Sequence, residues 1–187
     1  MAQAPLPGLR IWVRILGYSI AALIGALIHV LVLPVIALSG VVPDVLLVLV
    51  FWVALRHGQV AGTVAGFAIG LLLDVVMQGG LGVHAFAKTL AGFVVGFFAR
   101  LDDPEWLRSV ELWRVMGIVA LGTTVHAVVY HALLLHPLDA PSFLFVLAYA
   151  GAAVVYTLIV AMGLLLGWRL LGRRGLTSAR SRFPPVG

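Results

Sequence analysis

Long apolar runs, separated by short segments rich in proline, glycine and charge, are the feature that most constrains the fold of this chain. A transmembrane helix needs about 20 predominantly apolar residues, and most of these runs reach or approach that length. Hydrophobic residues make up 63% of the sequence and charged residues only 10%, and the mean hydropathy is +1.15. A soluble domain with this composition would lack enough polar side chains to cover its surface. The sequence therefore predicts an all-α, polytopic integral membrane protein.

The proline, glycine and charge signals divide the chain into six predicted transmembrane helices, all within one domain of residues 1–176. Pro34 ends the first helix, and Pro43 stands at the start of the second, which is short for a span. The predicted spans are about residues 11–33, 43–57, 59–77, 83–100, 113–136 and 142–171. Residues 177–187 are predicted to form a basic, disordered cytoplasmic tail.

The basic residues fall on one side of the predicted membrane. Eleven of the twelve are expected inside when the N-terminus is cytoplasmic: Arg10, Arg14, Arg56, Arg100, Arg108, Arg114, Arg169, Arg173, Arg174, Arg180 and Arg182. The opposite connections, residues 34–42, 78–82 and 136–141, contain none. The positive-inside rule then predicts that both termini are cytoplasmic. The basic tail accounts for the net charge of +5 without a nucleic-acid partner, and we expect anionic lipid headgroups to be its neighbours.

Catalytic and metal-binding signatures are missing from the sequence. The chain has no cysteine, which excludes disulfides, thiolate metal sites and cysteine nucleophiles. The HExxH, GxSxG and phosphate-loop patterns are absent. His131 and His136 are separated by about 140° around a helix, so they do not converge on one metal. His29 and His126 are predicted to be hydrogen-bonded packing residues. We expect no catalytic residue, metal or cofactor, and hence no enzyme.

Two charged residues lie where the membrane should be. Asp74 precedes the turn at residues 78–82 and Lys88 follows it, so a helical hairpin would bring them together. A charge at membrane depth costs about 2.5–3.5 kcal/mol on insertion scales, and pairing removes much of that cost. We therefore expect an ion pair between Asp74 and Lys88. The pair would either fix the hairpin register or release one partner to a ligand or protein. Asp44, which follows Pro43, is predicted to cap the second span.

Small residues recur every four positions beside these charges. Gly62, Gly66 and Gly70 precede Asp74 at this spacing, and Gly92 and Gly96 follow His84 and Lys88 in the same way. Side chains four apart share one helix face, and glycine stripes allow close contact between helices. These glycines are predicted to pack helix against helix, which would turn both charged residues toward protein.

Three segments within Pro43–Arg100 form a recognisable pattern: PDVLLVLVFWVALRHGQVAG, which contains Asp44; GFAIGLLLDVV, which contains Asp74; and LGVHAFAKTLAGFVVG, which contains His84 and Lys88. In these segments the chain resembles the MreD family of bacterial rod shape-determining membrane proteins. The size of the chain, its six predicted spans and its lack of extramembrane domains also suit that family.

The resemblance implies a non-catalytic role in the bacterial cytoplasmic (inner) membrane. MreD-like proteins are partners of the single-span MreC protein in the elongation machinery, or elongasome, which couples MreB filaments to the RodA and penicillin-binding-protein pair that builds lateral-wall peptidoglycan. The family also resembles, in fold, the substrate-binding subunits of energy-coupling-factor transporters. That likeness implies an outward cavity near Asp44, Asp74, His84 and Lys88, although a shared fold does not establish a ligand.

Two other classes of protein remain open. A small-molecule capture subunit of the energy-coupling-factor type would need several converging polar and aromatic groups, and the outer connections offer only His136, Asp139 and Ser142. A membrane enzyme acting on lipid-linked precursors would need a free acid, base or metal, whereas Asp74 and Lys88 are expected to neutralise each other. A scaffold needs only packed helices and an accessible apolar surface. The sequence does not predict which residues would bind the partner.

Overall fold

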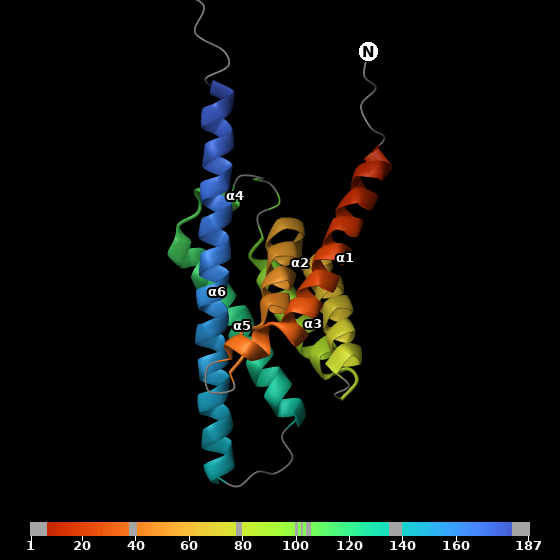
Figure 1. The fold of residues 1–187 in the computed structure, drawn as a ribbon, viewed down its shortest axis with the longest axis vertical. Coiled ribbons are helices and arrows are strands. Elements are labelled where there is room, and N and C mark those ends of the chain that lie inside the picture. Colours follow the sequence, from red (N-terminus) through yellow and green to blue (C-terminus); the bar gives the residue numbers. More distant parts are fainter. Residues whose placement is uncertain are drawn as a thin grey trace, which may run out of the picture.

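The computed structural model is all-helical over the residues that it describes, which are 7–37, 41–77, 80–99, 101, 103, 106–134 and 140–180. The elements, in chain order, are α1 (Pro7–Leu31), the 3-10 helix η1 (Leu33–Ile36), α2 (Val45–Met77), α3 (Val83–Phe97), α4 (Trp106–Ser109), α5 (Leu112–Leu134) and α6 (Ala140–Arg180) (Figure 1). The predicted all-α class is confirmed.

Apolar helices of membrane-spanning length dominate the described part of the chain. Four segments are long and apolar enough to cross a bilayer: Trp12–Val35, Val45–Met77, Leu112–Leu134 and Val146–Leu170. The helix α3 is also apolar but shorter, with 15 residues. These helices indicate a membrane protein. The count of six spans and the cytoplasmic placement of the termini stay predictions.

The helix α2 is interrupted at Gly58, at the boundary predicted between the second and third spans. Gly58 has φ 85° and ψ −174°, a conformation that glycine adopts readily because it has no Cβ. In a straight helix, Ala54 and Gly62 would be about 12 Å apart. Instead, a Cβ placed on Gly62 would lie 2.6 Å from the Ala54 Cβ. The residues before and after Gly58 therefore fold back on each other, as the two neighbouring segments in Figure 1 show.

The core forms where α3 packs against both segments of α2, with α5 on the other side. Phe51 of α2 is 1% exposed, and its ring lies where a Cβ on Gly122 of α5 would collide, at 2.8 Å. Val95 of α3 packs in the same cluster. The absence of a side chain at Gly122 thus lets α5 approach the α2–α3 pair closely.

The helix α6 is longer than predicted. Its 41 residues extend about 60 Å, which exceeds the roughly 40–45 Å of a bilayer with its headgroups. It continues to Arg180, so residues 177–180 of the predicted disordered tail are helical. Residues 181–187 lie outside the described residues.

Arg14, Arg56 and Arg169 gather at one end of the bundle. Arg14 and Arg56 line one cavity together with Leu107, and the Arg169 guanidinium donates hydrogen bonds to the Leu107 carbonyl at 2.9 Å and the Val110 carbonyl at 2.8 Å. At the other end of α1, His29 lines a second cavity together with Asp44, His84 and His126. The bundle thus has a basic end and an end with buried histidines and carboxylates.

A candidate intramembrane polar site

Asp44 stands immediately before α2 and binds the start of that helix. Its carboxylate Oδ1 accepts a hydrogen bond from the backbone N–H of Leu47 at 2.8 Å. The first N–H groups of a helix have no partner within the helix, and an aspartate before the helix supplies one. Asp44 therefore occupies the N-cap position, as its place after Pro43 predicted.

The other oxygen of Asp44 forms an ion pair with Lys88 of α3. The Lys88 side chain is fully buried, and that of Asp44 is 15% exposed. The expected pair between Asp74 and Lys88 is therefore wrong: the hairpin brings the two residues to the same end of α3, but the ammonium points across the bundle to Asp44. The reason is that Asp74 has a different set of partners.

Asp74 binds the beginning of α3 through three backbone N–H groups. Its Oδ2 accepts from Gly82 at 2.9 Å and from Ala85 at 3.1 Å, and its Oδ1 accepts from His84 at 3.0 Å. Hydrogen bonds from a helix N-terminus to a carboxylate are charge-assisted and compensate the charge without a lysine. Asp74 thus caps a helix other than its own, and it fixes the turn between α2 and α3.

Asp44 also connects α2 to the two C-terminal helices. Its backbone N–H donates to the hydroxyl Oγ1 of Thr157 on α6 at 3.0 Å. The Nε2 of His126 on α5 lies 3.9 Å from the Asp44 carboxylate. Thr157 is 1% exposed and His126 is 9% exposed, so these contacts are buried. One aspartate thereby joins α2, α3, α5 and α6.

Aromatic rings extend this cluster toward the end of the bundle. The His84 imidazole stacks on the Tyr130 ring with centroids 4.6 Å apart, and the His126 ring lies 6.3 Å from that of His84. The three side chains line a cavity of about 270 Å³, whose wall also includes His29, Asp44 and Thr157. Asp74 and Lys88 lie beside the cavity rather than in its lining.

Three imidazole nitrogens in the cavity wall are buried and have no hydrogen-bond partner among the described residues. They are Nδ1 of His29, Nδ1 of His84 and Nε2 of His126. Buried polar atoms usually have a partner, so these three are candidates for contact with a bound molecule. Among the described residues, no group of three or more histidine, cysteine or acidic side chains is placed to hold a metal ion.

The sequence does not predict this convergence. It predicts His29 and His126 to be hydrogen-bonded packing residues, and no sequence signal points to Tyr130 or Thr157. His29 is on α1, His126 and Tyr130 are on α5, and Thr157 is on α6, and these three helices are separate from one another and from Asp44 along the chain. Helical spacing identifies residues that share a face of one helix, and it says nothing about which faces of separate helices meet. The residues named from the outer connection, His136 and Asp139, lie outside the described residues.

The glycine stripes lie at the contact between α2 and α3. A Cβ on Gly66 would overlap the Lys88 carbonyl, and one on Gly70 would lie 2.5 Å from the Ala85 Cα. Gly62 and Gly92 face each other, and a Cβ on Gly96 would lie 2.6 Å from the Gln59 Cα. The backbones touch along this line, and this contact positions Lys88 toward Asp44.

Comparison with known families identifies a relationship to a described family. The family model described as "rod shape-determining protein MreD" matches residues 10–104, just over half of the chain. That range includes Asp44, Asp74, His84 and Lys88, and it ends before α5 and α6. No solved structure matches this chain.

Proposed function

Because this chain belongs to the MreD family of rod shape-determining proteins, we propose that it is a non-catalytic scaffold of the elongasome. In this role it binds a single-span MreC-like protein in the bacterial inner membrane and supports lateral-wall peptidoglycan synthesis. Membership of the family gives the chain its part in rod-shape determination. The partner, the scaffold mechanism and the inner-membrane, six-span topology belong to the proposal, as do the further links to MreB and to the RodA and penicillin-binding-protein pair.

The observation that carries the scaffold proposal is the use of both buried carboxylates to join helices. Asp74 is bound by three backbone N–H groups, and Asp44 is bound by Lys88 and by the start of α2. A membrane enzyme acting on lipid-linked precursors would need an acid or base that is free to exchange protons with its substrate. Carboxylates committed in this way favour a rigid frame over a catalytic centre.

The surface of the bundle offers several helix faces to a partner helix. Exposed apolar side chains include Leu23 on α1, Phe86 and Phe93 on α3, Val128 on α5 and Ile159 on α6. Because lipid tails are as apolar as these side chains, helices associate in a membrane through close packing rather than through burial of apolar surface. A single-span partner is expected to cover one of these faces and leave the others to lipid.

Single-cysteine crosslinking tests the proposal directly, since the chain has no native cysteine. Cysteine would replace each of the five exposed residues in turn, and a photoactivatable crosslinker would be attached in native membranes. We expect crosslinks to a single-span protein from one or two neighbouring helices only. Cysteine at Ala87, which is fully buried, is the matched control and should give none. Crosslinks to an ATPase-bearing transporter, or to no single-span protein from any face, would contradict the scaffold proposal.

A second candidate function is favoured by the histidine-lined cavity. A small-molecule capture subunit needs converging polar and aromatic groups, and His29, His84, His126 and Tyr130 provide them around about 270 Å³. If the chain has this function, purification in mild detergent should recover two ATPase subunits and a second polytopic protein. Recovery of a single-span protein without them would exclude it.

A further inference from the structure

A polar cavity lies at the basic end of the bundle, away from the histidine-lined cavity. Its volume is about 370 Å³, and its wall includes Arg14, Tyr18, Arg56 and His57. The Tyr18 hydroxyl and the His57 Nε2 are hydrogen-bonded to each other at 2.9 Å. This cavity belongs to neither the scaffold argument nor the candidate capture site.

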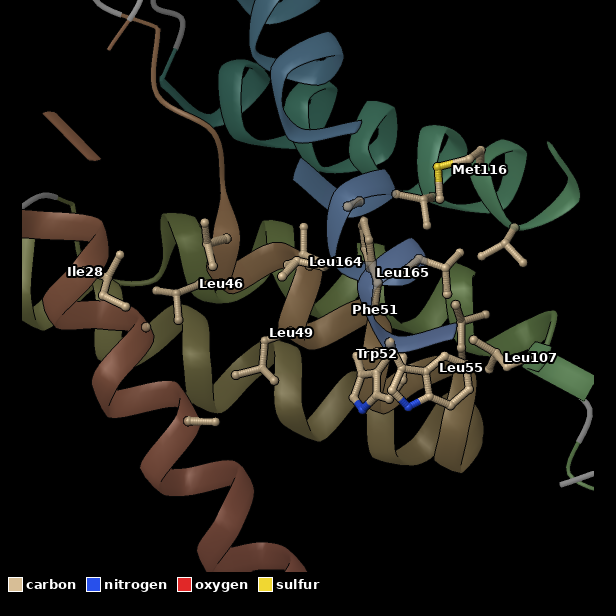
Figure 2. Close-up of a pocket in the computed structure, with 18 of the residues that line it drawn as sticks. Ile28, Leu46, Leu49, Phe51, Trp52, Leu55, Leu107, Met116, Leu164 and Leu165 are labelled. Carbon is tan, nitrogen blue, oxygen red and sulfur yellow. The ribbon is translucent and has the colours of Figure 1, made fainter. Parts of the chain in front are cut away.

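Two apolar grooves adjoin this polar cavity, one on each side of α1. The first, of about 530 Å³, lies between α1, the first segment of α2, α5 and α6. Figure 2 shows Ile28 of α1, Leu49 of α2 and Leu164 of α6 around this space. The second, also about 530 Å³, lies between α1 and the second segment of α2. The polar cavity shares Leu55 with the first groove and Arg14 with the second, so the three spaces are neighbours.

The polar cavity carries an excess of positive charge. Neither Arg14 nor Arg56 forms an ion pair with any residue that the structure describes. The Arg56 guanidinium lies over the Trp52 and Trp168 rings, 5.0 and 5.2 Å from their centroids. Asp103 also lines the cavity and is not without a partner. The cavity wall thus carries two positive charges and one negative charge, which favours binding of an anion, and guanidinium groups match the geometry of phosphate.

The lengths of the grooves correspond to one leaflet of a membrane. The first groove follows α2 from Leu55 to Val45, which is about 15 Å of helix, and the hydrocarbon of one leaflet is about half of 30 Å. The second follows α2 from Ala61 to Leu72, about 17 Å. Each groove is therefore long enough to hold an acyl chain of one leaflet.

We propose that this end of the protein binds one anionic phospholipid. The headgroup phosphate contacts Arg14 and Arg56 in the polar cavity, and the two acyl chains lie in the grooves on either side of α1. The helix α1 has its main packing contacts with α2 and η1 alone among the described elements. The lipid therefore fills the spaces that separate α1 from the rest of the bundle and holds this helix in place.

Native mass spectrometry of the full-length protein in mild detergent tests the proposal. The probes are dioleoyl phosphatidylglycerol, which is anionic, and dioleoyl phosphatidylcholine, which has no net charge. We expect one phosphatidylglycerol to remain bound in preference to phosphatidylcholine. A basic residue near an anionic surface contributes about fivefold in affinity, so Arg14→Gln with Arg56→Gln should weaken retention about 25-fold. Arg114→Gln is the matched control, since Arg114 is exposed and paired with Glu111, and it should bind as the unmodified protein does.

Further variants and probes separate a lipid from a free anion. Ala61→Phe and Ala21→Phe place a ring in the second and the first groove, respectively, and each should lower phosphatidylglycerol retention while both arginines remain. Equal retention of dihexanoyl and dioleoyl phosphatidylglycerol, or full displacement by inorganic phosphate, would overturn the proposal because only the headgroup would then matter. Equal retention of the two dioleoyl lipids would also overturn it, and that comparison needs no variant. A loss with Arg114→Gln as large as with the double variant would do the same.

Discussion

Lys88 on α3 is paired with Asp44, a residue 44 positions earlier in the chain, and not with Asp74, which lies directly across the turn between α2 and α3. The two carboxylates therefore have different roles in the bundle. Asp74 compensates the dipole at the start of α3, and Asp44 compensates the charge of Lys88 while it caps α2. The charge of Asp74 is thereby compensated by the N-terminus of α3, and the charges of Asp44 and Lys88 compensate each other.

Removal of Lys88 alone should destabilise the fold strongly. Lys88→Met leaves the Asp44 carboxylate buried without its cation, and breaking a buried pair in this way costs about 3–5 kcal/mol in the free energy of unfolding. Asp44→Asn together with Lys88→Met should recover most of that loss, because neither charge remains and asparagine still caps α2. Reversible unfolding in mixed micelles measures the difference. The double variant Asp74→Asn with Lys88→Met is the control and should show no recovery of stability. Recovery in this control would show that Lys88 pairs with Asp74 instead of Asp44.

Substitution of Asp74 should loosen the turn before α3. Asp74→Asn leaves only one side-chain oxygen to accept the three N–H groups of Gly82, His84 and Ala85. Loss of a hydrogen bond to a charged group costs roughly 1.5–3 kcal/mol. We expect faster hydrogen exchange at these three amides and a lower unfolding free energy. Glu111→Gln, at a residue with an exposed side chain, serves as the comparison. Unchanged exchange in the Asp74 variant would show that its carboxylate does not hold the turn.

The contact between α2 and α3 should tolerate no side chain at Gly66. A Cβ there would overlap the Lys88 carbonyl, which belongs to a helix backbone and cannot move aside. Gly66→Ala is expected to cost about 1–3 kcal/mol, as overpacking of a well-packed core does. Gly163→Ala on α6 has open space around the new methyl and should be neutral or stabilising by up to about 1 kcal/mol. Thermal unfolding of both variants in the same detergent compares them, and equal shifts would contradict the close approach.

Thr157 should be needed to hold α6 against the start of α2. Thr157→Val keeps the shape of the side chain but removes the acceptor of the Asp44 N–H, and a buried donor left without a partner costs about 1–3 kcal/mol. Thr124→Val on α5 is the matched control, because the Thr124 hydroxyl is exposed and bonds only within its own helix. Unfolding free energies should fall for the first variant and stay within about 0.5 kcal/mol for the second. Equal effects would rule out this link between the helices.

Local sequence signals predicted the helical elements well. Apolar runs located the helices, Pro43 and Asp44 located the start of α2, and the boundary predicted between the second and third spans coincides with the break at Gly58. These features depend on neighbours within a few residues, because propensity, capping and proline geometry act over one or two turns. The continuation of α6 over residues 172–180 is not predicted, since this basic and glycine-containing segment carries no apolar pattern.

The sequence by itself determined that this chain is an apolar helical protein, that the charges of Asp74 and Lys88 need partners, and that Asp44 stands where it can cap a helix. Only the tertiary structure decided which partners they have. The choice depended on the close contact of α2 with α3, which aims Lys88 across the bundle, and on α5 and α6, which bring His126 and Thr157 to Asp44. Helical periodicity specifies directions around one helix axis. The meeting of four helices at one aspartate depends on how their faces pack, and that information is spread over the whole chain.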